Sequence, residues 1–240
     1  MIGEILELLY PERCPACDAF TDGRVGLCER CAVSLYPLGP ACPRCAEPEA
    51  APVPVVCFRC VRDAPSFARA WVPWRYGGEL AVAIRRWKYG GPHASGRPEL
   101  SRPLAAMAAL ALAAAALDVD TIVPVPVHAH RRRERGFSQA ERLVGATRGF
   151  VRDLPRVDTR VLRRTRATVD QAGLSRAARR QNVRDAFVVE ARDAPRVTGV
   201  SVLLVDDVLT TGATADAAAG CLLAAGARRV EVFALARAES

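Results

Sequence analysis

The sequence has almost no lysine and few aromatic residues. Lys88 is the only lysine among 34 basic residues, and aromatic side chains make up 6% of the chain. The scarcity of aromatics disfavours a surface on which successive bases of a single-stranded nucleic acid stack. Because arginine replaces lysine everywhere else, Lys88 has two interpretations: a compact ammonium beside a phosphate, or a surface lysine left by chance.

The sequence also lacks an apolar run long enough to cross a membrane. The longest run, Leu104–Leu117, has 14 residues of mostly alanine, whereas a membrane-spanning helix needs about 20. Near the amino terminus, Glu4 and Glu7 stand where a secretory signal carries positive charge, so this segment predicts a short amphipathic helix. We therefore expect a cytoplasmic protein without a membrane span.

Positive charge is concentrated in one part of the chain. The net charge is +8, yet the stretch from Arg131 to Arg184 holds 16 arginines and five acids, which gives +11 there. A localised positive field favours a polyanionic ligand, such as the phosphates of a metabolite or of a nucleic acid. The alternative is an arginine-rich surface that only faces solvent.

Eight of the nine cysteines form four CxxC pairs near the amino terminus. The pairs are Cys14 and Cys17, Cys28 and Cys31, Cys42 and Cys45, and Cys57 and Cys60. Two CxxC turns complete the tetrahedral Cys₄ shell of a structural zinc site, which has no open coordination position. Disulfides are disfavoured because a reducing cytosol keeps such thiols free. Redox-active pairs are disfavoured because no thioredoxin-like strand and helix surrounds them.

The sequence therefore predicts two structural zinc ions in a double zinc ribbon. Residues 14–60 contain few large aliphatic side chains, so this region cannot be ordered by core burial and needs metal ligation. Pairing in sequence order, first with second and third with fourth, is expected, with a cross-braced pairing as the alternative. We place a domain boundary between residues 1–65 and residues 66–240.

The second part of the chain alternates strand and helix patterns. Strands are expected at 67–76, 121–128, 200–205 and 230–235, and helices at 78–91, 99–117, 138–151 and 215–225. Ser138 and Glu141 form a capping box at one helix start, and a loop is expected over 125–137. The βαβ pattern at the end predicts a doubly wound α/β domain whose ligand lies outside the carboxyl ends of the strands.

The stretch 202–214 reads VLLVDDVLTTGAT and carries the predicted site. Asp206 and Asp207 are expected at the strand end, with a turn from Val208 through Leu209 to Thr214. The N–H groups of Thr211, Gly212 and Ala213 and the hydroxyls of Thr210, Thr211 and Thr214 would form a nest for a phosphate monoester. The two carboxylates would then accept hydrogen bonds from vicinal hydroxyls of a sugar whose 5′-phosphate lies in the turn. Neither GxxxxGK[ST] nor GxGxxG is present.

This stretch resembles the phosphoribosyl pyrophosphate (PRPP) motif of type I phosphoribosyltransferases. The wider pattern resembles the ComF family of competence-associated phosphoribosyltransferase-like proteins over nearly the whole chain. Its blocks, in order, are the CxxC pairs, IRRWKYGG, IVPVPVHAHRRRERGFSQA, RTRATVDQAGLSRAARRQNVRDAF and the PRPP motif. The resemblance implies a type I phosphoribosyltransferase fold, a mostly parallel sheet flanked by helices, and a role in DNA uptake.

The resemblance also implies residue roles. Asp206 and Asp207 would hold the ribose hydroxyls, and Thr210–Thr214 the 5′-phosphate. The loop after Val123 would bind pyrophosphate through Val125, Pro126, His128 and Arg131. Residues 163–182 would form a flap, with Arg166, Gln171 and Arg179 closing over the leaving group. Thr210 stands where purine-salvage relatives have a carboxylate, so the acceptor, an amine or a base, stays open.

Two functions are compatible with these observations. In the first, pyrophosphate leaves C1 of PRPP, Mg²⁺ bridges pyrophosphate and ribose oxygens, and Arg131 stabilises the charge on the leaving group. In the second, the protein keeps the fold and the sugar-phosphate site but transfers nothing. It would then act as a PRPP sensor, or handle single-stranded DNA together with the competence machinery.

Overall fold

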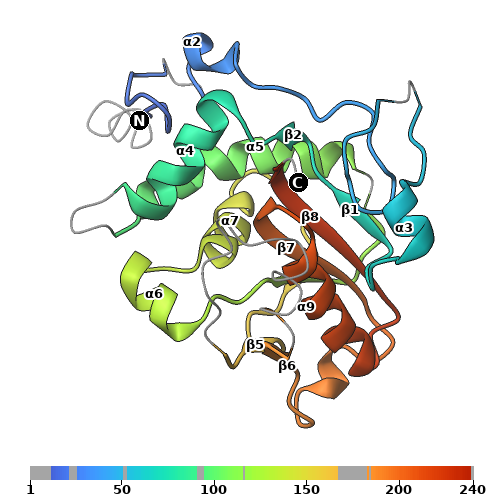
Figure 1. Ribbon diagram of the computed structural model, residues 1–240. Coiled ribbons are helices and arrows are strands. Elements are labelled where there is room, and N and C mark those ends of the chain that lie inside the picture. Colours follow the sequence, from blue (N-terminus) through green and yellow to red (C-terminus); the bar gives the residue numbers. More distant parts are fainter. Residues whose placement is uncertain are drawn as a thin grey trace.

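The computed structural model describes residues 12–21, 26–50, 53–90, 95–115, 117–166, 183 and 185–238 (Figure 1). Most of the expected amino-terminal helix lies outside the described residues, as do Gln171 and Arg179 of the expected flap. Within the described ranges, no helix combines the length and the apolar character that crossing a membrane requires.

A parallel sheet of short and long strands forms the centre of the molecule. The long strands β7 (Ser201–Leu209) and β8 (Arg229–Arg237) lie in the middle and pair from Ser201 opposite Arg229 to Leu209 opposite Arg237. Strands β3 (Thr121–Pro124) and β4 (Arg156–Val157) extend the sheet beside β7. Beyond β8 lie β1 (Arg69–Trp71) and β2 (Trp74–Arg75), both parallel to it. The mostly parallel sheet predicted from the sequence is confirmed.

Helices cover both faces of this sheet. Leu203 and Val205 of β7 pack on the side of α4 (Gly78–Tyr89), α5 (Ser101–Ala114) and α7 (Gln139–Thr147). Val202 and Leu204, which point the other way, pack on the side of α9 (Ala213–Ala224). Successive residues of a strand face opposite sides, so a continuous apolar run is what a strand buried on both faces needs.

The remaining short elements lie around this core. They are α2 (Glu29–Ala32), α3 (Phe58–Arg62), η2 (Pro98–Leu100), α6 (Ala129–Arg135), η3 (Ala194–Arg196) and the antiparallel pair β5 (Arg163–Arg164) and β6 (Phe187–Val188). In Figure 1, α2 lies beyond the end of α4, whereas α3 lies on the β1 side. The two cysteine regions therefore contact different parts of the sheet domain.

Three sequence predictions about these elements were wrong in detail. The expected strand 67–76 is two short strands, β1 and β2, separated at Pro73, which has no N–H to donate to a ladder. The expected loop 125–137 contains the helix α6, which ends at Gly136 with a left-handed φ of 82°. The helix predicted from Ser138 does start there, where the Ser138 hydroxyl caps the N–H of Glu141, but it ends at Thr147.

The predicted end of the central strand was also wrong. Strand β7 does not stop at Asp206 and Asp207 but continues to Leu209. The cause is pairing with a strand that is distant in the sequence, because β8 continues to Arg237 and keeps β7 hydrogen-bonded as far as Leu209. The turn into α9 is therefore short, from Thr210 to Gly212.

Candidate functional site

A cavity of about 470 Å³ opens at the carboxyl ends of β3 and β7. This is the edge of a doubly wound sheet at which a ligand is expected. The predicted site residues that line it are Lys88, Val125, Pro126, Arg131, Asp206, Asp207, Val208, Leu209, Thr210, Gly212 and Thr214. Segments more than a hundred residues apart in the sequence thus form one cavity.

The two aspartates lie on this cavity and differ in their surroundings. The Lys88 Nζ atom, on α4, donates to Asp207 Oδ1 at 2.8 Å, and both side chains of this ion pair are mostly buried. The backbone N–H of Asp207 donates to Asp206 Oδ1 at 2.9 Å. Burial, and then the neighbouring Asp207 charge, raise the pKa of Asp206 to about 7. Near pH 7 Asp206 is therefore ionised in only about half of the molecules.

The turn after β7 is built around a glycine. Gly212 has a φ of 81°, a left-handed conformation that glycine adopts without a Cβ clash, and it is the N-cap of α9. Helix α9 continues for 12 residues behind it, so the partial positive charge of its amino terminus lies at the cavity edge. An anion in the turn would be stabilised there.

Two of the predicted turn residues face away from this cavity. Thr211 and Ala213 do not line it but border a small cleft on the side of the second cysteine region, together with Cys45 and Arg59. The Thr211 hydroxyl accepts the N–H of Ala213 at 3.3 Å instead of facing a ligand. Only Thr210 and Thr214 of the three turn threonines line the cavity.

Positive charge dominates the rest of the cavity lining. Among the residues that the structure describes, the cavity is lined by five basic side chains, Arg85, Lys88, Arg131, Arg135 and Arg164, and by two acids. Burial, and then the charge of Arg131, lower the pKa of Arg164. Because these arginines repel one another, a multiply charged anion between them would relieve the repulsion.

Sequence reasoning pointed to the arginines of the loop 125–137, Arg135 among them, but it did not single out Tyr76, Arg85, Tyr89 or Gln139, which also line the cavity. Arg135 is buried, stacks over the Tyr89 ring with its Cζ 4.7 Å from the ring centroid, and donates to Gln139 Oε1 at 3.2 Å. The Gln139 Nε2 atom is buried and has no hydrogen-bond partner among the described residues. Tyr76 and Arg85 complete the wall from the α4 side. For Tyr89, its position next to Lys88 in the sequence was an available signal.

One predicted pyrophosphate residue does not reach the cavity. His128 is the N-cap of α6, where its Nδ1 accepts the N–H of His130 at 3.2 Å, and it is not among the lining residues. Arg166, expected in the flap, does not line the cavity either, whereas its neighbour Arg164 does.

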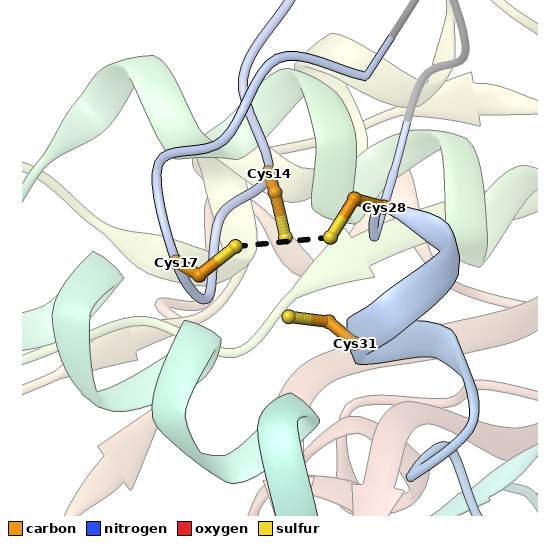
Figure 2. A group of neighbouring side chains, drawn as sticks. All are labelled: Cys14, Cys17, Cys28 and Cys31. Atoms are coloured by element: carbon orange, nitrogen blue, oxygen red, sulfur yellow. Dashed lines mark hydrogen bonds between the residues drawn. The ribbon is translucent and has the colours of Figure 1, made fainter.

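The eight paired cysteines form two separate clusters. The first contains Cys14, Cys17, Cys28 and Cys31, and the second contains Cys42, Cys45, Cys57 and Cys60; within each, all four sulfur atoms lie within 4.8 Å of one another. Figure 2 shows the first cluster, in which the sulfurs of Cys14 and Cys17 from a loop and of Cys28 and Cys31 from the start of α2 turn toward a common centre. The pairing in sequence order, predicted above, is confirmed, and the cross-braced alternative is excluded.

The donor set of each cluster fits structural zinc. A zinc–sulfur bond of about 2.3 Å puts tetrahedral ligand sulfurs about 3.8 Å apart. The Sγ atoms of Cys17 and Cys28 are 3.7 Å apart, and those of Cys45 and Cys57 are 3.6 Å apart. Four thiol ligands leave no position for a substrate, so the ions would hold the fold and take no part in chemistry.

Two family models match different parts of the chain. The family model described as "Double zinc ribbon domain" matches residues 5–61, and the one described as "Phosphoribosyl transferase domain" matches residues 114–240.

Two curated relatives illustrate what the chain is similar to. It is 31% identical to "DNA utilization protein YhgH" of Escherichia coli O157:H7 over 220 residues, 90% of this chain and 92% of the relative. It is 30% identical to "Competence protein F" of Haemophilus influenzae over 215 residues, 89% and 91% of the two chains.

Among solved structures, the chain is similar to the glutamine PRPP amidotransferase of B. subtilis complexed with ADP and GMP. The TM-score is 0.39 at 21% identity, over 62% of this chain and 30% of that one.

Proposed function

Because the chain belongs to the ComF family of phosphoribosyltransferase-like proteins, we propose that it binds PRPP in the cavity at the end of the sheet. We further propose that it transfers the phosphoribosyl group to an acceptor and releases pyrophosphate. One observation carries this proposal: Asp206, Asp207 and the Gly212 turn face the same cavity as five basic side chains.

In the proposed complex, the 5′-phosphate of PRPP lies against the Gly212 turn and the amino terminus of α9. The hydroxyls of Thr210 and Thr214, which line the cavity, donate to its oxygens. The ribose 2′ and 3′ hydroxyls donate to the carboxylates of Asp206 and Asp207. The Lys88 ammonium, 2.8 Å from Asp207 Oδ1, fixes the orientation of the Asp207 side chain. A direct contact of Lys88 with a phosphate stays a prediction.

The pyrophosphate end of PRPP is proposed to lie among Arg131, Arg135 and Arg164. Val125 and Pro126, which follow β3 and line the cavity, lie on the same side. Mg²⁺ would arrive bound to the pyrophosphate, because the described part of the lining is mostly basic and offers two carboxylates, those of Asp206 and Asp207. When bound, this ion would offset charge on the pyrophosphate oxygens.

The proposed reaction is a displacement at C1 of the ribose. The bond from C1 to the pyrophosphate oxygen breaks, the oxygen keeps the electron pair, and a new bond forms from C1 to the acceptor nitrogen. The arginines stabilise the negative charge that grows on the departing oxygen. The turn has Thr210 where a carboxylate could take a proton from a ring nitrogen, which favours an amine acceptor that loses its proton to water.

We propose that both cysteine clusters bind zinc and that residues 1–65 and 66–240 form the two domains. A double zinc ribbon and two Cys₄ clusters support structural zinc. Without the metal, the small apolar content of the first region would leave it unfolded.

A second candidate function is the handling of single-stranded DNA without transfer. The names of the relatives concern DNA utilization and competence, and residues 131–184 carry a net charge of +11. Aromatic residues are only 6% of the chain, however, which leaves few rings on which bases could stack. The phosphoribosyl site therefore remains the first candidate.

Calorimetric titration with PRPP and Mg²⁺ tests the binding proposal. The wild-type protein is expected to bind, and the Asp206→Ala, Asp207→Ala double variant is expected to lose at least about 100-fold in affinity, because both ribose acceptors are gone. The control is Asp153→Ala, which removes an exposed aspartate elsewhere. Equal affinity of the double variant and the control would remove the site assignment.

Release of pyrophosphate separates the two candidate functions. Incubation of the protein with PRPP and a panel of amines and bases is expected to release pyrophosphate with at least one acceptor. Salt-sensitive binding of single-stranded DNA, with no pyrophosphate release from any acceptor, would favour the second candidate.

A further inference from the structure

One arginine side chain joins the second cysteine cluster to the turn after β7. Arg59 lies on α3 between Cys57 and Cys60, and its guanidinium has partners both in the cysteine region and in the turn. Its Nη2 donates to Cys45 Sγ at 2.9 Å, and its Nη1 donates to the backbone oxygen of Thr211 at 3.0 Å. These two partners are far apart in the sequence, so the contact exists only in the folded chain.

A second arginine, Arg237, links the second cysteine region to the chain just before this turn, at Leu209. The side chain of Arg237, at the end of β8, is fully buried. Its Nε donates to the backbone oxygen of Ala46 at 3.1 Å, and its Nη1 donates to that of Leu209 at 3.0 Å. Glu47 forms ion pairs with both arginines. The carbonyl of Thr211 is thus held by Arg59 of the second cysteine region, and that of Leu209 is held by Arg237 of β8, which is itself bound to Ala46 and Glu47 of that region.

The Arg59 contact sets the direction in which the turn presents its next N–H group. In a planar trans peptide the carbonyl oxygen and the following N–H point to opposite sides. Because the oxygen of Thr211 points at Arg59, the N–H of Gly212 points away from the cysteine region. Gly212 lines the cavity. The donor needed for an anion in the turn is therefore oriented from behind, by a residue outside the cavity.

The zinc-bound form of the cluster would strengthen this arrangement. Four thiolates around one zinc ion carry a net charge of about −2, which favours a hydrogen bond from a guanidinium to sulfur. A guanidinium can donate in two fixed directions at once, so it can serve Cys45 and Thr211 together, whereas the compact lysine ammonium cannot reproduce that planar geometry.

We propose that Arg59 is a positioning residue that couples the second cysteine cluster to the anion-binding turn. The ordered cluster fixes Arg59, Arg59 fixes the peptide between Thr211 and Gly212, and that peptide sets the affinity of the turn for a phosphate group. The consequence for PRPP rests on the function proposed above, whereas the consequence for the order of the turn does not.

The first cluster provides a matched control. Asp18, next to Cys17, forms ion pairs with Arg86 of α4 and with Arg97, and Arg86 Nη1 donates to the oxygen of Pro15 at 3.1 Å. Like Arg59, Arg86 ties a cysteine region to the rest of the molecule. Arg86 belongs to α4, however, and its contacts with Asp18 and Pro15 lie in the first cysteine region and not in the turn after β7.

The test is hydrogen exchange at the turn, measured by NMR or mass spectrometry together with zinc content. The reporter amides are those of Ala213, which donates to Thr211 Oγ1, and Ala238, which donates to the Leu209 oxygen. In Arg59→Ala these amides are expected to exchange at least about tenfold faster than in wild type, because the turn opens locally. In Arg86→Ala they are expected to be unchanged.

Ligand affinity and a conservative variant complete the test. PRPP affinity is expected to fall about tenfold or more in Arg59→Ala and less in Arg59→Lys, with two zinc ions per chain retained in Arg59→Lys. If Arg59→Ala loses zinc, its effects could come from the loss of the cluster, and the Arg59→Lys variant then provides the test. Amide exchange rates and PRPP affinity equal to those of wild type in Arg59→Lys would overturn the proposal. A wild-type protein that binds no PRPP would refute the proposed function, and the exchange rates would still decide the role of Arg59.

Discussion

The two cysteine clusters have the same ligands and nearly the same spacing, yet they are attached to different parts of the molecule. The first cluster packs into the core on the α4 and α5 face of the sheet, and the second packs into the core on the α9 face. Asp18 ties the first region to α4, while Arg59 and Arg237 tie the second to the end of β7.

Each cluster therefore supports a different wall of the cavity. Helix α4 carries Lys88, Arg85 and Tyr89, which line one wall, and the turn at Gly212 lines the other. The ion pair between Lys88 and Asp207 connects the two walls. Two copies of one metal motif can therefore stabilise different halves of a single site.

Removal of one zinc ligand from each cluster tests this difference most strongly. Cys57→Ser and Cys28→Ser are each expected to lose one zinc ion, since a structural site needs four ligands. We expect the loss in PRPP affinity to reach at least about 100-fold for Cys57→Ser but only about tenfold for Cys28→Ser, because the turn depends on the second cluster. Zinc analysis and calorimetry measure both effects, and equal losses would contradict the assignment of walls.

The acids beside the two clusters should differ in their contribution to stability. Glu47→Gln leaves the fully buried Arg237 without its counter-ion and is expected to lower the free energy of unfolding by about 3 kcal/mol. Asp18→Asn removes a carboxylate that is 42% exposed and should cost about 1 kcal/mol or less. Urea denaturation monitored by circular dichroism measures both. A larger cost for Asp18→Asn would reverse the comparison.

Asp206 lies between the walls and should make stability depend on pH. Its pKa is about 7 in the folded protein against an ordinary value of 3.8, and Asp207, Lys88 and Arg164 are the charged groups that act on it. The folded state holds the proton up to about pH 7, whereas the unfolded state loses it near pH 4. Stability from this group is therefore present below pH 4 and is lost as the pH rises to 7.

Asp206→Asn is expected to remove this loss. At pH 8 the variant should be more stable than wild type by roughly 4 kcal/mol, since each pKa unit of the shift corresponds to about 1.4 kcal/mol, and near pH 4 the difference should vanish, while PRPP binding is reduced at both values. Denaturation curves across this range measure the effect. A stability difference that does not change with pH would show that Asp206 has an ordinary pKa.

A glycine substitution in the turn should give the smallest effect. Gly212→Ala meets no close atom, since the nearest to an added Cβ is 3.9 Å away, so its cost comes from the positive φ and is about 1 kcal/mol. The control is Gly145→Ala, in the interior of α7 with open space around it, which should stabilise by about 0.5–1 kcal/mol. Thermal unfolding measures both, and the same sign for both would contradict the left-handed turn.

The parts of the fold that the sequence predicted well are those set by local pattern. The apolar run at 200–205, the helix after Gly212 and the strand at 230–235 form a βαβ unit because each carries its own periodicity and its own stop signal. The cysteine pairs predicted two clusters because CxxC spacing fixes ligand geometry within a few residues.

The parts that were missed depend on distant contacts. The helix α6 has the sequence AHRRRER, with no apolar face to reveal it, and it ends where the buried Arg135 packs on Tyr89. The extension of β7 to Leu209 depends on the partner strand β8. The contact from Arg59 to Thr211 joins residues 152 positions apart, and a local sequence pattern carries no information about it.

A crystal structure of the protein with PRPP and Mg²⁺ would test the proposed site most directly. The account predicts one phosphate within about 3 Å of the Gly212 nitrogen, with ribose hydroxyls at hydrogen-bond distance from Asp206 and Asp207. A PRPP molecule bound elsewhere, or with its ribose turned away from both aspartates, would contradict it.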